Sequence, residues 1–222
     1  MAFAIMRMAK IKSCVEGNAR MKHNRREIAC VTSNPDKKDI CLILGDRMRE
    51  DKNKTFTQIF HERTKGQKIR SNAVYSLEIV LTFSSGGIAG NLNEWVKTNA
   101  DWLRKHFGEE NIIDCRLHLS EKTPHIHAMI LPIDENGKLN CRRYTGGNKH
   151  KMSEFQDDYG RAMEKFGLER GICRTLTKAQ HESSLRWHAM QAVKEERLKQ
   201  YERVYGNEFK SDTATQPEYT TR

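Results

Sequence analysis

The sequence predicts an α/β (α+β) domain whose central, mainly antiparallel β-sheet is flanked by helices. Residues 74–83, VYSLEIVLTF, alternate between apolar and other residues in the way typical of a strand. Residues 91–107 place apolar residues at helical spacing, and residues 114–119 and 125–133 predict two strands joined by the turn EKTP. One pair of predicted strands is connected by a helix and another by a tight turn, so a doubly wound parallel sheet is less favoured.

The first part of the chain predicts a strand over residues 3–12, a turn at Asn34-Pro35-Asp36 and a helix over residues 55–64. The strand at 74–83 is expected to be half-buried, with the core-facing side formed by Tyr75, Leu77, Ile79, Leu81 and Phe83. Its other side would then meet solvent.

Two helices are predicted to flank the sheet. Gly108 is placed to end the helix over residues 91–107, whose Trp95 and Trp102 are expected in the core. A second helix over residues 153–166 is expected to be capped by Ser153 and ended by Gly167.

The chain is expected to form one main domain, residues 1–180, followed by a peripheral helix and polar tail, residues 181–222. The helix is charged and begins near residue 178. After Gly206 the sequence turns polar, which is typical of a mobile end.

The composition favours a polyanionic partner. Lys and Arg number 39 against 29 Asp and Glu, which gives a formal net charge of +10. Nucleic acid is the first candidate and an anionic membrane surface the second. No apolar run reaches the roughly 18 residues of a membrane span, so we expect a soluble, cytoplasmic protein with no membrane segment. The six cysteines form no C-x-x-C pair and are expected to be reduced thiols.

The stretch HLSEKTPHIH at residues 118–127 places three histidines around one turn. Residues two apart on a strand point to the same face, so His125 and His127 would present their imidazoles side by side. If the two strands pair across the turn, His118 reaches the same face. Three imidazoles that leave coordination positions open are typical of a catalytic metal site. A lone H-x-H pair would carry little weight, because that spacing is common in strands.

Two further expectations concern this stretch. Ile126 and Ala128 are expected to face the core on the other side of the strand. Glu121, in the turn, would either ligate the ion weakly or accept a hydrogen bond from a histidine N–H. The plainer alternative is a solvated turn glutamate.

HLSEKTPHIH resembles the H-x-D-E-x-T-P-H-x-H signature of the Mob/Pre (MobV-type) family of plasmid mobilisation relaxases, or plasmid recombination enzymes, in the HUH endonuclease superfamily. One position departs from it, because Ser120 stands where the family usually has Asp. RMKHNRRE at residues 20–27 resembles the H-N-x-R motif of the same family, laid onto His23, Asn24 and Arg26, with an N-P-D turn after it. The resemblance covers residues 1 to about 180.

The resemblance implies an HUH relaxase-like fold and a metal-dependent relaxase. Such an enzyme nicks one strand at a plasmid or mobile-element transfer origin by transesterification, forms a covalent 5′-phosphate adduct and rejoins the strand. It implies a divalent ion, Mn or Mg, held by His118, His125 and His127. The DNA partner would be a single-stranded or hairpin-forming origin. A coupling protein would have to be contacted through regions that cannot be identified in the sequence.

The resemblance also implies catalytic residues: His23, Arg26, Glu121 and Arg70. His23 would be the nucleophile, although superfamily members usually attack with tyrosine. Neighbouring arginines would lower the pKa of His23 and hold phosphate oxygens. Arg70 matches a family position that faces the active site, and a surface charge on a loop is the equal alternative.

The basic segments are expected to contact DNA through Lys22, Arg25, Lys68, Arg142, Arg143, Tyr144 and Lys149. Among these, Tyr144 would stack on an unpaired base, and it is the main rival of His23 as nucleophile.

Three other readings stay open from the residues. A rolling-circle replication initiator would use the same metal cluster with a tyrosine on a downstream helix. A DNA-binding regulator would use the metal structurally and never cut. A zinc hydrolase of small substrates is disfavoured by the charge and by the lack of an H-E-x-x-H motif.

Overall fold

The computed structural model of the chain describes residues 2–30, 33–84, 86–146, 150–171 and 184–205. The chain divides into two compact units, Met1–Ile172 and Cys173–Arg222. The boundary predicted at residue 180 lies outside the described residues, so that division stays a prediction. No helix among the described residues is long and apolar enough to cross a membrane.

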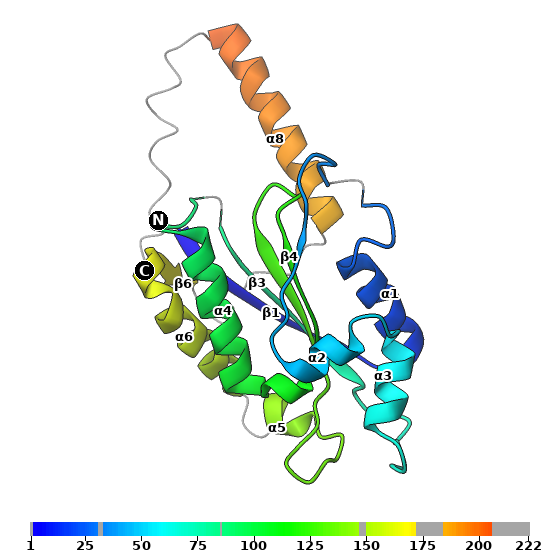
Figure 1. Ribbon diagram of the computed structural model, residues 1–222. Coiled ribbons are helices and arrows are strands. Elements are labelled where there is room, and N and C mark those ends of the chain that lie inside the picture. Colours follow the sequence, from blue (N-terminus) through cyan, green and yellow to red (C-terminus); the bar gives the residue numbers. More distant parts are fainter. Residues whose placement is uncertain (1, 31–32, 85, 147–149, 172–183, 206–222) are drawn as a thin grey trace. The chain divides into compact units, whose positions relative to one another are not determined.

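The first unit is built around a six-stranded sheet of order β2-β4-β5-β3-β1-β6 (Figure 1). The strands are β1 (Ala2–Ile11), β2 (Ile40–Cys41), β3 (Ser76–Phe83), β4 (Ile112–His118), β5 (His125–Ile130) and β6 (Leu168–Arg170). Neighbouring strands are antiparallel except β1 and β6, which are parallel. The predicted α/β fold with a mainly antiparallel sheet is confirmed.

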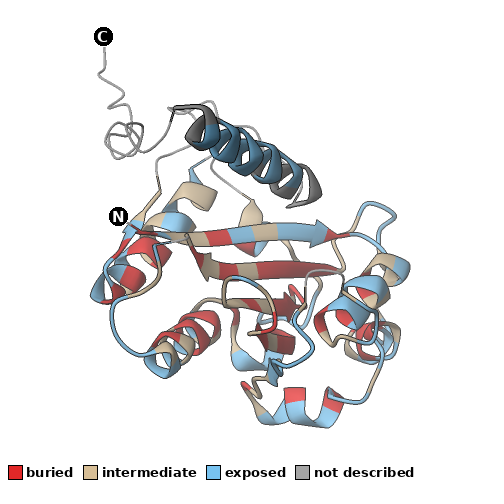
Figure 2. Ribbon diagram, turned by 90° about the horizontal axis from the view of Figure 1, so that it is seen from above, coloured by how far each residue is buried: buried red, intermediate tan, exposed pale blue. Residues whose placement is uncertain are grey.

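Helices lie on both faces of this sheet (Figure 2). They are α1 (Cys14–Asn24), α2 (Asp46–Asp51), α3 (Phe56–Arg63), α4 (Leu92–Phe107), α5 (Arg142–Thr145) and α6 (Lys151–Met163), with short 3-10 turns at Glu109–Asn111 and Glu164–Phe166. In the second unit, α8 spans Ser184–Tyr205. The first six residues of the helix predicted there, 178–183, lie outside the described residues.

The termini of α4 agree with the sequence. Asn91 caps its first turn by accepting from the backbone N–H of Asn93, and Gly108 ends it at φ 76°, a conformation that glycine adopts without strain. The predicted cap of α6 is wrong. That helix begins at Lys151, and the Ser153 hydroxyl instead accepts a 2.9 Å hydrogen bond from Nη2 of Arg170.

Two hydrophobic cores lie on opposite faces of the sheet. The larger one packs α4 and α6 on the sheet through side chains that include Leu77, Ile79, Leu81, Trp95, Trp102, Phe107 and Tyr159. The smaller one packs α1 and α3 through Ile11, Met21, Phe56, Ile59, Phe60, Ile113, Met129 and Leu131. Burial of each such side chain contributes about 1.5–3 kcal/mol to folding.

The smaller core corrects the expectation for β3. Because α1 and α3 cover its second face, Ser76 and Glu78 are buried as well as Leu77 and Ile79, so the strand is not half-buried. Tyr75 precedes the strand and belongs to the smaller core, where its ring stacks on Phe60 at 4.3 Å. It therefore does not share the side of Leu77.

Helix α1, which carries part of the site below, was not expected from apolar spacing. Ser13 caps it by accepting from the backbone N–H of Glu16, and this S-x-x-E spacing is the signal that could have revealed it. Gly17 lets α1 approach α3, because a Cβ there would overlap the ring of Phe56.

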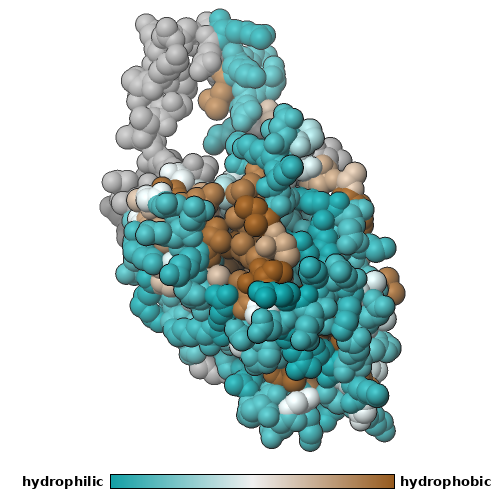
Figure 3. All heavy atoms as spheres, viewed as in Figure 1, coloured by the Kyte–Doolittle hydropathy of each residue, from teal (hydrophilic) through white to brown (hydrophobic). Residues whose placement is uncertain are grey.

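The surface is largely hydrophilic on the face in Figure 3, with apolar side chains gathered in a hollow beside α4.

Candidate active site

Strands β4 and β5 bring the three histidines together. His118 is the direct partner of His125, and Arg116 is the partner of His127, in the register expected across the EKTP turn. On the opposite side of β5, Ile126 and Ala128 are fully buried in the larger core. The core therefore fixes which face the imidazoles occupy.

The imidazole nitrogens converge on one point. One ligand nitrogen from each of His118, His125 and His127 lies within 4.8 Å of the others, and Nδ1 of His118 lies 3.2 Å from Nε2 of His125. That separation suits two ligands of one ion, since metal–nitrogen distances are about 2.0–2.1 Å.

Each ring is oriented by an acceptor on its other nitrogen. Nε2 of His118 donates to the backbone carbonyl of Asn24 at 2.8 Å, and Nδ1 of His125 donates to that of Thr123 at 2.9 Å. Nδ1 of His127 donates to Oε1 of Glu78 at 3.1 Å. Because these acceptors have no proton to give, the nitrogens with free lone pairs are Nδ1 of His118 and Nε2 of His125 and His127.

Glu78 is a member of the site that the sequence did not single out. Its buried carboxylate also accepts from Nδ2 of Asn24 at 3.3 Å and from Nη1 of Arg20 at 3.2 Å. Burial raises its pKa, but the hydrogen bonds and positive neighbours outweigh this, and the net pKa of Glu78 is lowered. An ionised carboxylate behind His127 holds the ring and strengthens its free nitrogen as a ligand.

His118 and His125 are neutral, which is the form in which an imidazole binds a metal. Burial lowers the pKa of His118 to about 4 and also lowers the pKa of His125, in both cases assisted by nearby positive charge. At pH 7 both rings therefore offer a lone pair without having to lose a proton.

His23 stands in front of this cluster, on the last turn of α1. Its ring centroid lies 6.2 Å from that of His127 and 6.5 Å from that of His118. Partial burial, then the charges of His127 and Arg26, lower its pKa. A neutral imidazole is nucleophilic, so His23 is in its reactive form at pH 7.

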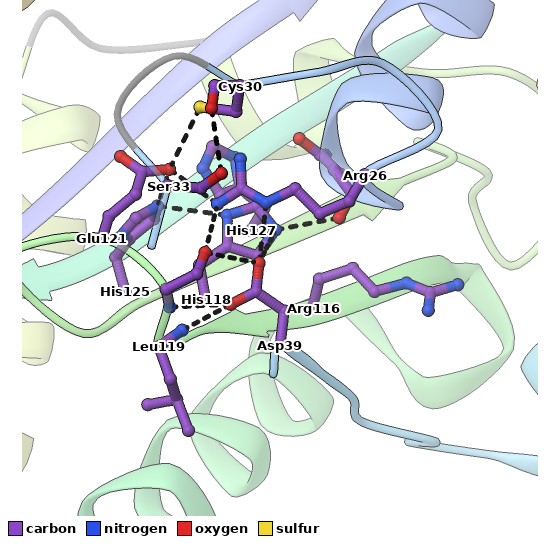
Figure 4. Close-up of polar contacts among 12 residues, drawn as sticks. Arg26, Cys30, Ser33, Asp39, Arg116, His118, Leu119, Glu121, His125 and His127 are labelled. Atoms are coloured by element: carbon purple, nitrogen blue, oxygen red, sulfur yellow. Dashed lines mark hydrogen bonds and ion pairs between the residues drawn. The ribbon is translucent and has the colours of Figure 1, made fainter. Parts of the chain in front are cut away.

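Arg26 connects two carboxylates beside the histidines (Figure 4). Its Nε donates to Oδ2 of Asp39 at 2.7 Å, and its Nη2 donates to Oε1 of Glu121 at 2.6 Å. The same Glu121 oxygen lies 3.8 Å from Nε2 of His125. Glu121 thus lies on the side of the lone-pair nitrogens, which fits a weak ligand better than an acceptor of a histidine N–H.

Arg26 does not have its guanidinium available for phosphate. Only Nη1 has no hydrogen-bond partner among the described residues, and that atom is buried. Its backbone has φ 57°, unusual for a residue other than glycine. The two ion pairs fix its side chain.

This geometry can be compared with known proteins. The family model described as plasmid recombination enzyme, Mob_Pre, matches residues 1–189. The chain belongs to the Mob/Pre family.

Individual relatives agree with the family match. The Mob/Pre chain is 27% identical over 197 residues to plasmid recombination enzyme type 3 of Staphylococcus aureus, covering 82% of the chain and 46% of that protein. It is 30% identical over 176 residues to the 65 kDa protein of Zymomonas mobilis, covering 77% of the chain and 30% of that protein. The chain therefore spans less than half the length of these curated relatives.

Among solved structures, the MobM relaxase domain bound to plasmid pMV158 oriT DNA, in a Mn-bound crystal structure at pH 6.5, matches with a TM-score of 0.70. The sequence identity is 25%, and the match covers 86% of the Mob/Pre chain and 98% of that domain. The predicted relaxase-like fold is confirmed.

The structure does not bring every expected site residue of this Mob/Pre chain to the histidines. Arg70 is exposed on the loop before β3, where with Lys68 and Arg142 it lines a separate groove of about 680 Å³. Lys10 of β1 also lines the groove, and it pairs with Leu77 near the start of β3. His125 pairs with Thr82, five residues further along β3. Arg70 therefore lies toward the end of the sheet away from the metal cluster.

Two expected DNA contacts conflict with burial. The Arg25 side chain, 9% exposed, pairs with Asp114 at 3.1 Å and donates to the carbonyl of Lys54. Tyr144 is buried in the larger core, with its hydroxyl 3.4 Å from Nδ2 of Asn111, so its ring is not a platform for a base.

Two further residues expected to contact DNA lie at the surface, and a third is not described. Lys22 is exposed on α1 beside His23, and Arg143 pairs with Glu135 at the surface. Lys149 lies outside the described residues.

The tyrosines whose side chains are described do not offer a nucleophile beside the cluster. Tyr144 is buried, and so is Tyr159, which donates to Oδ1 of Asn99. Tyr75 stacks on Phe60. The side chains of Tyr201, Tyr205 and Tyr219 lie outside the described residues.

Proposed function

We propose that this chain carries a metal-dependent relaxase that nicks one DNA strand at a plasmid or mobile-element transfer origin and later rejoins it, acting in the cytoplasm. The observation that carries the proposal is the convergence of three lone-pair imidazole nitrogens behind a fourth, neutral imidazole, His23. Family membership supports the same function. The relatives are longer than this chain, so the proposal concerns the domain that carries this site.

The donor set fits a divalent cation held by His118, His125 and His127, with Glu121 as a weak further ligand. Mg²⁺ prefers oxygen ligands in near-ideal octahedral geometry. Of the two ions expected, we therefore propose Mn²⁺, in line with the Mn-bound MobM structure. When bound, such an ion would polarise a phosphate oxygen and offset the charge that develops there.

His23 performs the bond exchange in this proposal. A lone-pair nitrogen of its ring attacks phosphorus, a P–N bond forms, and the bond to the 3′ oxygen breaks. The 3′ oxygen takes up a proton, and the ring, positively charged after the attack, gives up its N–H proton. Because the P–N linkage keeps the phosphoryl group activated, the 3′ hydroxyl can attack it and reseal the strand without ATP.

We propose that the groove lined by Lys68, Arg70 and Arg142 binds the phosphate backbone of the DNA. Lys10 and Lys138 also line it, and none of its described lining residues is acidic or aromatic. No ion pair among the described residues joins any of these five cations to a carboxylate. Unpaired cations without a stacking ring suit the phosphates of a duplex arm, such as a hairpin stem, better than unpaired bases.

Removing part of this groove should flatten the salt dependence of origin binding. Each phosphate contact contributes about 0.9 to the slope of log affinity against log salt on duplex DNA, so the triple variant K68A/R70A/R142A should lower the slope by about 2–3. The matched control R47A/K52A/K97A removes three exposed cations elsewhere and should leave the slope unchanged. Equal slopes for both triple variants would remove the groove from the proposal.

Nicking itself is tested on a supercoiled plasmid that carries the cognate origin. With Mn²⁺, denaturing electrophoresis should show one strand cut at one position, and a plasmid without the origin should stay intact. Without the ion, no cut should form. Origin binding with no cut under any of these conditions would favour the non-cleaving regulator.

A further inference from the structure

Asp39, from the segment before β2, makes several contacts at the edge of the site. Its Oδ1 accepts the backbone N–H groups of Leu119 at 2.7 Å and Ser120 at 2.9 Å. Its Oδ2 accepts Nε of Arg26 at 2.7 Å and the hydroxyl of Ser120 at 3.1 Å. Burial raises its pKa, but these hydrogen bonds outweigh the burial and lower the pKa of Asp39 to about 2. The carboxylate is therefore ionised throughout the working pH range.

These contacts connect the two elements that carry the reacting groups. The two amides belong to the residues directly after His118, where β4 ends. Arg26 follows the end of α1 and donates its backbone N–H to the carbonyl of His23 at 3.0 Å. One carboxylate thus ties the strand end that carries a metal ligand to the helix end that carries the nucleophile.

We propose that Asp39 is a positioning residue, which sets the placement of His23 relative to the metal-facing nitrogens by holding Arg26 against the end of β4. This rests on the proposed function, because the placement matters only if His23 attacks a phosphate bound at the cluster. Asp39 touches no reacting atom. Its Oδ2 lies 4.0 Å from Nε2 of His118, the nitrogen that donates to the carbonyl of Asn24 and not the one that would hold the ion.

A carboxylate at the neighbouring position 120 could make the same contact with Arg26. The Ser120 hydroxyl lies 3.4 Å from Nη2 of Arg26 and 3.1 Å from Asp39. An aspartate at 120 would therefore reach Arg26 directly. This is also the position at which the sequence departs from the signature that it resembles.

The geometry predicts opposite effects for one substitution in two backgrounds. In the wild type, Ser120→Asp would put a second carboxylate against Asp39, and like charges at this distance repel. In an Asp39→Ala background the same substitution would restore a partner for Arg26. Ser120→Asp should then impair the wild type and improve the variant, a pattern that a general loss of stability would not produce.

Asp39→Asn isolates the contact with Arg26. The amide oxygen can still accept the two backbone N–H groups, but the amide nitrogen facing Nε of Arg26 cannot. A displacement of His23 by about 1 Å should slow nicking by about 100-fold. Mn²⁺ affinity should be unchanged, because the three histidine ligands keep their own acceptors and Glu121 contributes only weakly. Asp36→Asn, an exposed aspartate in the same segment, is the matched control and should nick like wild type.

Three measurements complete the test: nicking rate, Mn²⁺ affinity, and the broadening of the His23 ring-proton resonances by bound Mn²⁺. D39N should show slower nicking and weaker broadening at unchanged affinity, and D39A/S120D should recover both relative to D39A. Wild-type nicking rate and broadening in D39N would overturn the proposal, as would a folded D39A/S120D that recovers neither. If the wild type itself does not nick, the proposed function fails instead, and the broadening still reports on whether Asp39 places His23.

Discussion

Replacing His23 by alanine should abolish the covalent adduct and reduce nicking by about 10⁴- to 10⁶-fold, the range seen when other enzymes lose a nucleophile. The reason is that, among the side chains that the structure describes, the variant has no other group in front of the metal cluster that can attack phosphorus. Tyr144 and Tyr159 are buried, and Arg26 is held between Asp39 and Glu121. The measurement is single-turnover cleavage of an origin oligonucleotide, with the adduct detected by its slower migration on a denaturing gel.

Mn²⁺ binding should survive in this variant, because His23 is not among the converging ligands. His61→Ala, an exposed histidine on α3, is the matched control and should cleave normally. An adduct formed by His23→Ala at the wild-type rate would exclude His23.

The lowered pKa of His23 also sets the pH dependence of the wild type. The reactive neutral ring is present above that pKa, so cleavage should persist below pH 6.5 and be lost as the pH falls through the lowered value.

Replacing His125 by alanine should abolish nicking while leaving origin binding largely intact. Changes behind a metal ligand typically cost 10- to 100-fold in metal affinity, and loss of a ligand should exceed about 100-fold. In the proposed function, origin binding depends instead on phosphate contacts away from the cluster. Calorimetric titration with Mn²⁺ and a gel-shift assay separate the two effects.

Partial recovery of nicking at high Mn²⁺ concentration would be consistent with a weakened site, because His118 and His127 remain in place. Undiminished nicking at low Mn²⁺ concentration would remove the metal site from the mechanism. Loss of origin binding in step with nicking would show that the cluster serves mainly to hold DNA.

The convergence of the three histidines could be predicted because local rules are sufficient for it. The two-residue period of a strand places His125 and His127 on one face, and a short turn returns the chain so that His118 pairs with His125. The two supporting carboxylates lie beyond such rules. Glu78 is 49 residues from His127, and Asp39 is 80 residues from Leu119. Only the order of strands in the sheet brings them to the site.

The site expectations that conflict with the observed burial or position depended on charge, residue type or resemblance. Arg25 is as basic in sequence as Lys22, yet it turns inward to Asp114 while Lys22 stays exposed. Tyr144 lies in a basic segment but packs beside Phe107 at 5.3 Å between ring centroids. Arg70 was assigned by resemblance to a position near the active site, and here it contributes to the separate basic groove.

The chemical nature of the linkage between protein and DNA distinguishes His23 from every tyrosine. The adduct is trapped on a cleaved origin oligonucleotide, exposed to mild acid, and digested so that the modified peptide can be mapped. A phosphoramidate on His23 is released by acid and maps to the peptide that contains the end of α1. An adduct that survives acid, or one that maps to a tyrosine, would contradict the attack by His23.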